Sequence, residues 1–146
     1  MSSAGVDDRH NVLFLCTGNS ARSIMAEAIL NRIGPPRFHA FSAGTHPKSV
    51  VHPETLRLLK TLGYDTTGLR SKSWSEFTST PNFAHIITVC GNAAGEPCPI
   101  IAGQPATMHW DIPDPSSANE RQSQIEAAFR KTYNVLLERI AAFIRQ

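Results

Sequence analysis

Apolar residues follow two different spacings along this chain, and the spacings predict strands that alternate with helices. Short apolar runs bounded by turn residues predict four strands, at residues 11–15, 37–43, 84–89 and 107–112. Apolar positions at helical spacing predict longer helices at residues 23–33, 52–62 and 119–146, and a short helical turn at 74–77. Breakers mark the helix ends, with Gly34-Pro35-Pro36 after the first helix and Gly63 after the second.

This alternation predicts an α/β fold. Strands separated by helices pair in parallel, so we expect a three-layer sandwich with a four-stranded parallel sheet covered on both faces. We expect residues 1–10 to be a flexible polar lead-in and residues 11–146 to form a single domain. Sheets of this kind bind ligands beyond the carboxyl ends of their strands, and Cys16 and Cys90 both follow predicted strands.

The loop that follows the first strand has the composition of an anion-binding site. It joins a strand to a helix, whose first backbone N–H groups have no intrahelical partner and carry partial positive charge. Arg22 can donate two hydrogen bonds to a tetrahedral oxyanion, and the same field and the Ser23 hydroxyl favour a thiolate at Cys16. The predicted substrate-binding residues are Thr17, Gly18, Asn19, Ser20, Ala21, Arg22 and Ser23.

Other interpretations of this loop are weaker. The motifs of the Walker loop and of the Gly-x-Gly-x-x-Gly dinucleotide loop are absent from the sequence. Cys16 could be an ordinary buried thiol and Arg22 a solvated charge, but neither role needs the glycine and the arginine at these positions.

Composition fits a globular protein without an unusual charge. The chain has 146 residues, of which 41% are hydrophobic and 18% are charged. A net charge of +2 gives no reason to expect nucleic acid or a membrane surface as a partner. The first ten residues lack the apolar segment of a signal peptide. Three cysteines without a disulfide-scaffold spacing fit a reducing compartment, so we expect a cytoplasmic protein.

Cys90 and Cys98 flank a stretch of mostly small residues that includes Gly91 and Gly95. They could be two unrelated thiols in a loop. A structural zinc site fits less well, because zinc sites usually use a closer cysteine pair and four ligands. The histidines show no metal-ligand spacing, and we expect neither a catalytic metal nor a cofactor.

The motif Cys-x5-Arg-Ser near the start of an α/β chain of this length resembles the low-molecular-weight protein tyrosine phosphatases. Cys-Thr-Gly-Asn-Ser-x-Arg-Ser, together with Phe41-Ser42-Ala43-Gly44, resembles the arsenate reductases that share this fold. The resemblance extends from Val12 to Pro115. It implies that Asp114, in Asp114-Pro115, is the general acid; Asp111 is the fallback, and a simple turn role for Asp114 is the competing interpretation.

The resemblance also implies a cysteine relay. Cys16 attacks arsenate, Cys90 attacks the resulting arsenic adduct, and Cys98 resolves the Cys16–Cys90 disulfide before thioredoxin or another thiol reduces the protein. The spacing between Cys90 and Cys98 is one residue longer than the spacing usual in these reductases. In some of these reductases a potassium ion lies near the loop, at positions that match Asn19, Glu27, Ser42 and Asp65.

The phosphatases carry aromatic walls for a phenolic ring, and this sequence lacks them. His46 and Pro47 follow Thr45, and Ser116 and Ser117 follow Pro115. The sequence therefore favours a small inorganic oxyanion, arsenate, over phosphotyrosine. Two alternatives remain: a phosphomonoester hydrolase that uses Cys16, Arg22 and Asp114, and an oxyanion-binding redox sensor without turnover.

Overall fold

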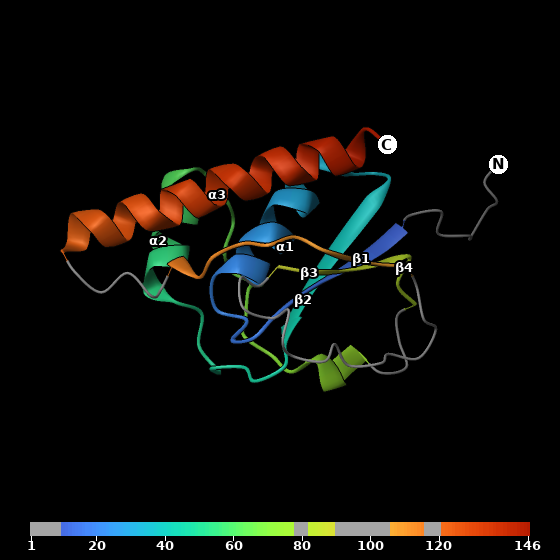
Figure 1. Ribbon diagram of the computed structural model, residues 1–146, viewed down its shortest axis with the longest axis horizontal. Helices are drawn as coiled ribbons and strands as arrows, with labels where there is room; N and C mark the ends of the chain where they lie inside the picture. Colours follow the sequence, from blue (N-terminus) through green and yellow to red (C-terminus); the bar gives the residue numbers. More distant parts are fainter. Residues whose placement is uncertain (1–9, 78–81, 90–105, 116–120) are drawn as a thin grey trace.

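The computed structural model describes residues 10–77, 82–89, 106–115 and 121–146. Its elements are β1 (His10–Cys16), α1 (Arg22–Ile33), β2 (Phe38–Gly44), α2 (Pro53–Thr61), the 3-10 helix η1 (Trp74–Phe77), β3 (His85–Thr88), β4 (Ala106–His109) and α3 (Gln122–Ile144). This order confirms the predicted alternation (Figure 1). The expected lead-in over residues 1–10 lies, apart from His10, outside the described residues.

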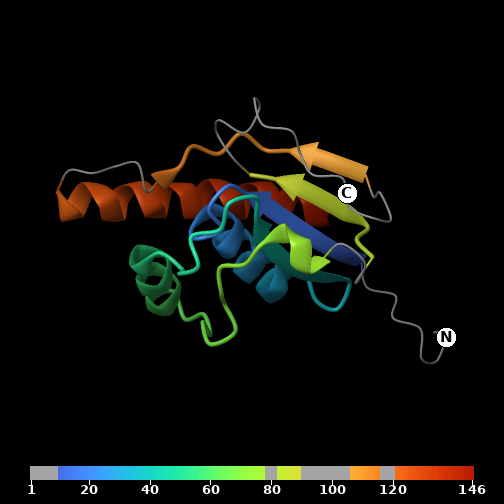
Figure 2. The same cartoon turned by 90° about the horizontal axis from the view of Figure 1, so that it is seen from below.

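The four strands form one parallel sheet in the order β2-β1-β3-β4. β1 is central, with Cys16 in register with Gly44 of β2 and Leu15 in register with Thr88 of β3. Figure 2 shows β1, β3 and β4 side by side, with β4 at the edge. Because the strands are parallel, their carboxyl ends lie at one edge of the sheet, and Cys16 is at that edge.

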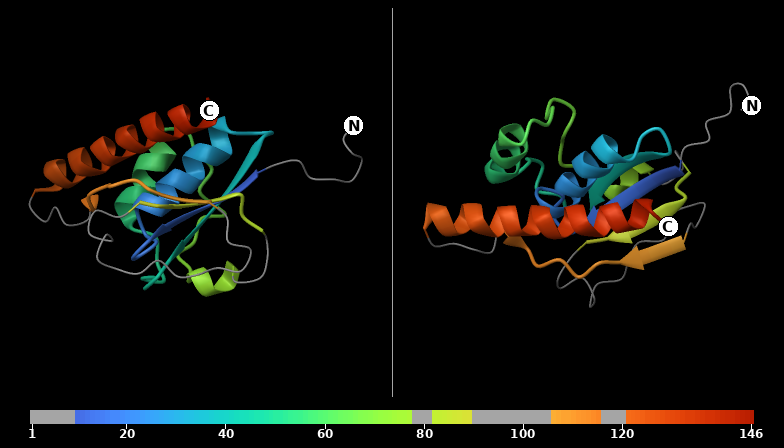
Figure 3. Two further views of the ribbon diagram at one scale, coloured as in Figure 1. Left: turned by 45° about the vertical axis from the view of Figure 1, so that its right-hand side comes forward. Right: turned by 90° about the horizontal axis from the view of Figure 1, so that it is seen from above.

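Side chains of β1 alternate between two cores. Val12 and Phe14 are fully buried in the cluster that includes the apolar residues of α1 and α3. Leu13 and Leu15 point to the opposite face, into a cluster whose other buried members are Ala43, Phe77, Phe83 and Ile86. Figures 1 and 3 show α1 and α3 on one side of the sheet and η1 on the other. The predicted three-layer sandwich is therefore confirmed.

α3 covers the sheet through α1 and also contacts α2. The apolar residues that predicted this helix form a stripe packed against the core, in which Phe129, Tyr133, Leu136, Ile140 and Phe143 are buried. No helix among the described residues is both long and apolar enough to span a membrane. The stripe fixes α3 over α1 and thereby supports the helix that begins at the candidate anion site.

The predicted strand at residues 107–112 is too long, because β4 ends at His109. Trp110 N still donates to Thr88 O (2.8 Å), but Thr88 is the last residue of β3, so the ladder has no further partner. Ile112 is buried away from the ladder, and its carbonyl accepts a hydrogen bond from Arg22. The apolar pattern of residues 110–112 therefore reflects burial beside the loop after β1.

The stripe on α3 predicts a large loss of stability when a buried leucine is truncated. Leu136→Ala removes a fully buried side chain and should lower the free energy of unfolding by about 2–5 kcal/mol. Urea unfolding measures this loss. The exposed neighbour Glu138 is the control, and Glu138→Ala should change stability by no more than about 0.5 kcal/mol. Equal stability losses in the two variants would contradict this packing.

Candidate active site

Cys16 ends β1 with its sulfur held between two polar groups. The side chain is buried, with 3% of its surface exposed. The backbone N–H of Asn19 donates to Sγ over 3.3 Å, and the Ser23 hydroxyl lies 2.9 Å from Sγ. Both groups stabilise a negative charge on the sulfur. The local structure therefore suits Cys16 to the role of a nucleophile.

The helix that follows the loop begins without a side-chain cap. Ala21 occupies the N-cap position, where no side-chain hydrogen bond forms, and the first turn of α1 carries no acidic residue. A helix terminus of this kind presents backbone N–H groups and partial positive charge to an anion. Arg22, at the first helical position, adds a full positive charge at the same place.

Arg22 is held by contacts on one side of the loop. Its side chain is buried, Nη1 donates to Ile112 O over 3.1 Å, and Nη2 lies 3.8 Å from Asp114 Oδ2. The Ile112 carbonyl anchors one nitrogen of the guanidinium. The structure thus brings Asp114 and Arg22 to the same site, as their predicted roles require.

A cavity of about 110 Å³ lies over the loop. It is lined by Cys16, Thr17, Gly18, Asn19, Ser20, Ala21, Arg22, His46, Lys48 and Asp114. Its volume is well below the roughly 300–1,000 Å³ of pockets for drug-sized ligands. None of the described residues that line it is Phe, Tyr or Trp. The cavity suits a small oxyanion better than a phenolic ring.

Most of the predicted site residues lie at this cavity. Ser23 is buried beneath it, bonded to the Cys16 sulfur. Asp111, the alternative acid, is exposed and does not line the cavity. Cys90, Cys98, Ser116 and Ser117 lie outside the described residues.

Asn19 connects the loop to three other parts of the fold. Its backbone is in the left-handed region (φ 47°), and its side chain is fully buried. Nδ2 donates to the hydroxyls of Ser23 (2.7 Å) and Ser42 (3.1 Å), and Oδ1 accepts from the backbone N–H of Lys72 (2.8 Å). The amide group thereby fixes the loop against α1, β2 and the segment before η1.

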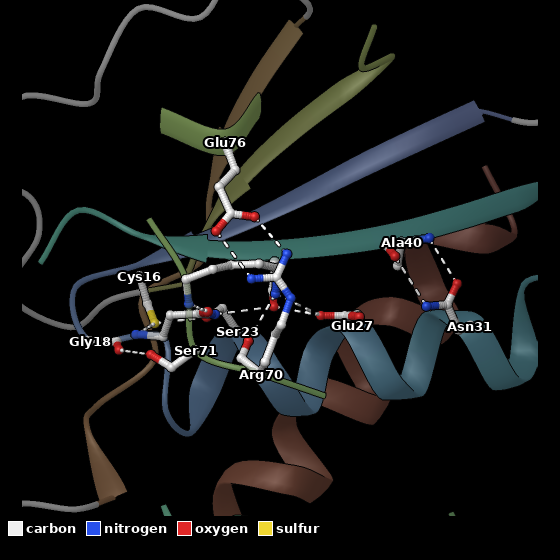
Figure 4. A network of polar contacts seen from close by, with 12 residues as sticks. Cys16, Gly18, Ser23, Glu27, Asn31, Ala40, Arg70, Ser71 and Glu76 are labelled. Carbon is white, nitrogen blue, oxygen red and sulfur yellow. Dashed lines mark hydrogen bonds and ion pairs between the residues drawn. The ribbon is translucent and has the colours of Figure 1, made fainter. Parts of the chain in front are cut away.

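This network continues to a largely buried ion pair between Glu27 and Lys72. Ser42 Oγ donates to Glu27 Oε1 (2.6 Å), and Lys72 Nζ lies 3.9 Å from the same oxygen. Glu27 is labelled in Figure 4. Burial raises the pKa of Glu27, and the bond from Ser42 and the charge of Lys72 oppose this change. Burial likewise lowers the pKa of Lys72, and Glu27 opposes it. Each partner thus offsets part of the other's desolvation.

The potassium site suggested by the resemblance does not fit this arrangement. Lys72 already places a positive charge beside Glu27, and the Asn19 carbonyl oxygen accepts from a backbone N–H. Asp65 is exposed and accepts hydrogen bonds from Thr67 N (3.0 Å) and Thr67 Oγ1 (2.8 Å). Three of the four side chains that the resemblance suggests for the metal ion therefore already have protein partners, which are Lys72 for Glu27 and Asn19 and Thr67 for Asp65.

The segment from residue 70 to 73 also holds the loop after β1 in place. Ser71 Oγ donates to Gly18 O over 3.1 Å, and Arg70 forms a two-point ion pair with Glu76 of η1 (2.6 and 3.1 Å; Figure 4). At Gly44, a Cβ atom would lie 2.6 Å from Thr17 O, so only glycine fits there. This close approach explains the glycine of the Ser42-Ala43-Gly44 motif.

His46 and Lys48 line the cavity and were not predicted as site residues. They follow β2, whose carboxyl end lies beside that of β1. The signal that could have identified them is the parallel pairing itself, since residues just after neighbouring parallel strands meet at one edge.

Comparison with known proteins shows the family to which this chain belongs. Residues 11–146 match the family described as low molecular weight phosphotyrosine protein phosphatase. An arsenate reductase of Halalkalibacterium halodurans is 30% identical, with 90% of this chain and 93% of that protein covered.

Two solved structures are similar over nearly their whole length. The arsenate reductase of Archaeoglobus fulgidus is 27% identical with a TM-score of 0.75, covering 92% of this chain and 99% of that one. An arsenate reductase in the phosphate-binding state is 26% identical with a TM-score of 0.77, covering 93% of this chain and 97% of that one. The chain therefore belongs to the low molecular weight phosphotyrosine protein phosphatase family.

Proposed function

We propose that this chain is an arsenate reductase, which converts arsenate to arsenite with electrons from its own thiols. The observation that carries this proposal is the small cavity with the Cys16 sulfur, the uncapped start of α1 and Arg22 around it. Arsenate and phosphate are tetrahedral oxyanions of similar charge, and the relatives named above are arsenate reductases. The cavity binds the oxyanion, and the thiols supply the redox chemistry.

The first step is a nucleophilic displacement at arsenic. The Cys16 thiolate forms an S–As bond while one arsenate oxygen leaves, and Asp114 supplies the proton that lets this oxygen leave as water. Arg22 and the amide groups of the loop stabilise the charge on the remaining oxygens. The product is a Cys16–arsenic(V) adduct.

The second step reduces arsenic. The Cys90 thiolate attacks Cys16 Sγ, the S–As bond breaks, and its electron pair leaves with arsenic as arsenite. The position of Val89 supports this role for Cys90. Val89 N donates to Leu15 O over 2.8 Å, and Cys90 follows Val89 just as Cys16 follows Leu15.

The third step frees Cys16. The Cys98 thiolate attacks Cys90 Sγ, a Cys90–Cys98 disulfide forms, and the Cys16 thiolate leaves. An external thiol reductant then returns both cysteines to thiols, and we propose thioredoxin for this role. We further propose that residues 11–146 act as a single domain and that the chain works in the cytoplasm, where reductants of this kind operate.

Phosphomonoester hydrolysis is the second candidate function. The proximity of Asp114 to Arg22 favours it, because water could attack a Cys16–phosphate adduct with the same acid and the same anion site. The absence of Phe, Tyr and Trp among the described residues lining the cavity disfavours aryl substrates. Hydrolysis of a small aryl phosphate should therefore be detectable but slow, and efficient hydrolysis of phosphotyrosine peptides would favour this second function.

Cys16→Ser tests the proposed reaction directly. This variant lacks the nucleophile but keeps the loop, so it should form no arsenite while arsenate still raises its melting temperature. Arsenic speciation with thioredoxin, thioredoxin reductase and NADPH measures the product. Substantial arsenite from Cys16→Ser would overturn the assignment. A wild-type protein that binds arsenate and forms no arsenite would be an oxyanion-binding sensor.

Arg22→Lys tests the two-point contact with the oxyanion. The ammonium keeps the charge but cannot make the planar pair of hydrogen bonds, so kcat/KM for arsenate should fall by about 100-fold or more. Arg32→Lys, on the same helix but with an exposed side chain, is the control and should stay within about two-fold. Wild-type kinetics for Arg22→Lys would contradict the proposed geometry.

The relay predicts different failures for the other two cysteines. Cys90→Ser should stop at the arsenic adduct and release no arsenite. Cys98→Ser should release about one arsenite per protein and then stop with Cys16 and Cys90 joined. Mass spectrometry identifies the adduct and the disulfide. Normal turnover of Cys98→Ser with thioredoxin would show that Cys98 is not the resolving thiol.

A further inference from the structure

The segment after β2 runs along the loop after β1 and is bonded to it at successive residues. Thr45 N donates to Cys16 O (3.1 Å), His46 N to Thr17 O (2.9 Å) and Lys48 N to Gly18 O (3.0 Å). These bonds fix the backbone of Lys48 relative to the anion site. Lys48 is therefore part of the rim of the cavity.

The aliphatic part of the Lys48 side chain packs over Gly18. A Cβ atom added at Gly18 would lie 3.1 Å from Lys48 Cε and 3.3 Å from Lys48 Cγ. The missing side chain at Gly18 thus leaves the space in which Lys48 lies. Lys48 is exposed and lines the cavity, so its ammonium can reach a bound anion while staying hydrated.

The charges at the cavity leave a role for a second cation. In the reactive state Cys16 is a thiolate and Asp114 carries the proton that it donates, so Arg22 balances only the charge of the thiolate. Arsenate enters as an anion with up to two negative charges at neutral pH. The described residues that line the cavity include one lysine, Lys48, and one arginine, Arg22.

We infer that Lys48 is a specificity-determining residue that attracts and holds doubly charged inorganic oxyanions at the mouth of the Cys16 cavity. This inference rests on the proposed arsenate reduction and names the group that selects its substrate by charge. The side chain stands at the rim of a cavity whose described lining residues include no Phe, Tyr or Trp. A cation there favours a bare oxyanion over an aryl ester.

Kinetics with arsenate provide the first test. Lys48→Met keeps the aliphatic stem over Gly18 and removes the charge, so KM should rise about five-fold at low salt while kcat stays within about two-fold. Lys48→Arg should restore KM, and 0.5 M salt should reduce the difference between Lys48→Met and wild type. Lys60→Met removes an exposed charge on α2 and should leave KM unchanged.

Alkylation of Cys16 provides a second test that needs no arsenate. Peptide mapping gives the rate at Cys16 for iodoacetate, an anion, and for iodoacetamide, which is neutral. Lys48→Met should slow iodoacetate about three- to five-fold and leave iodoacetamide within about two-fold.

The two tests separate the inference from the function on which it rests. If wild type forms no arsenite but Lys48→Met selectively slows iodoacetate, the proposed function fails and Lys48 remains the anion-recognising residue. An unchanged ratio of the two alkylation rates in Lys48→Met would overturn the inference. An equal change in Lys60→Met would also overturn it, because net charge alone would then account for the effect.

Discussion

The left-handed backbone of Asn19 is the constraint on which the site depends. Residues other than glycine are uncommon in this region, and asparagine is among those that tolerate it best. The conformation directs the Asn19 N–H to the Cys16 sulfur while the side-chain amide bonds Ser23, Ser42 and Lys72 N. One residue therefore sets the position of the thiolate and links it to three separate segments of the fold.

The charges around this loop fall into two groups. Glu27 and Lys72 are paired beneath the loop, and Arg70 and Glu76 are paired at its side, so these ions contribute support. Arg22, Asp114 and Lys48 line the cavity and face an incoming anion. The cavity-lining charges thus serve the chemistry and the paired charges support the loop, and both groups combine residues of α1 with residues from later parts of the chain.

The sequence was sufficient to predict the structure wherever an element or loop is formed by contiguous residues. β1, the loop and α1 are contiguous, so periodicity and the cysteine motif predicted them closely. Lys72 and Lys48 could not be found in this way, because their roles depend on tertiary pairing: Lys72 N bonds Asn19, and Lys48 reaches the loop through the parallel alignment of β1 and β2. The end of β4 was missed because the burial of Ile112 resembles that of a strand residue.

The central claim is that the electrons that reduce arsenate come from the cysteines of this chain. The most direct measurement mixes reduced wild-type protein with arsenate in the absence of any external thiol, and counts arsenite and remaining thiols together. The account predicts about one arsenite per protein and the loss of two of its three thiols, with Cys90 and Cys98 joined in a disulfide. Three intact thiols and no arsenite would contradict it.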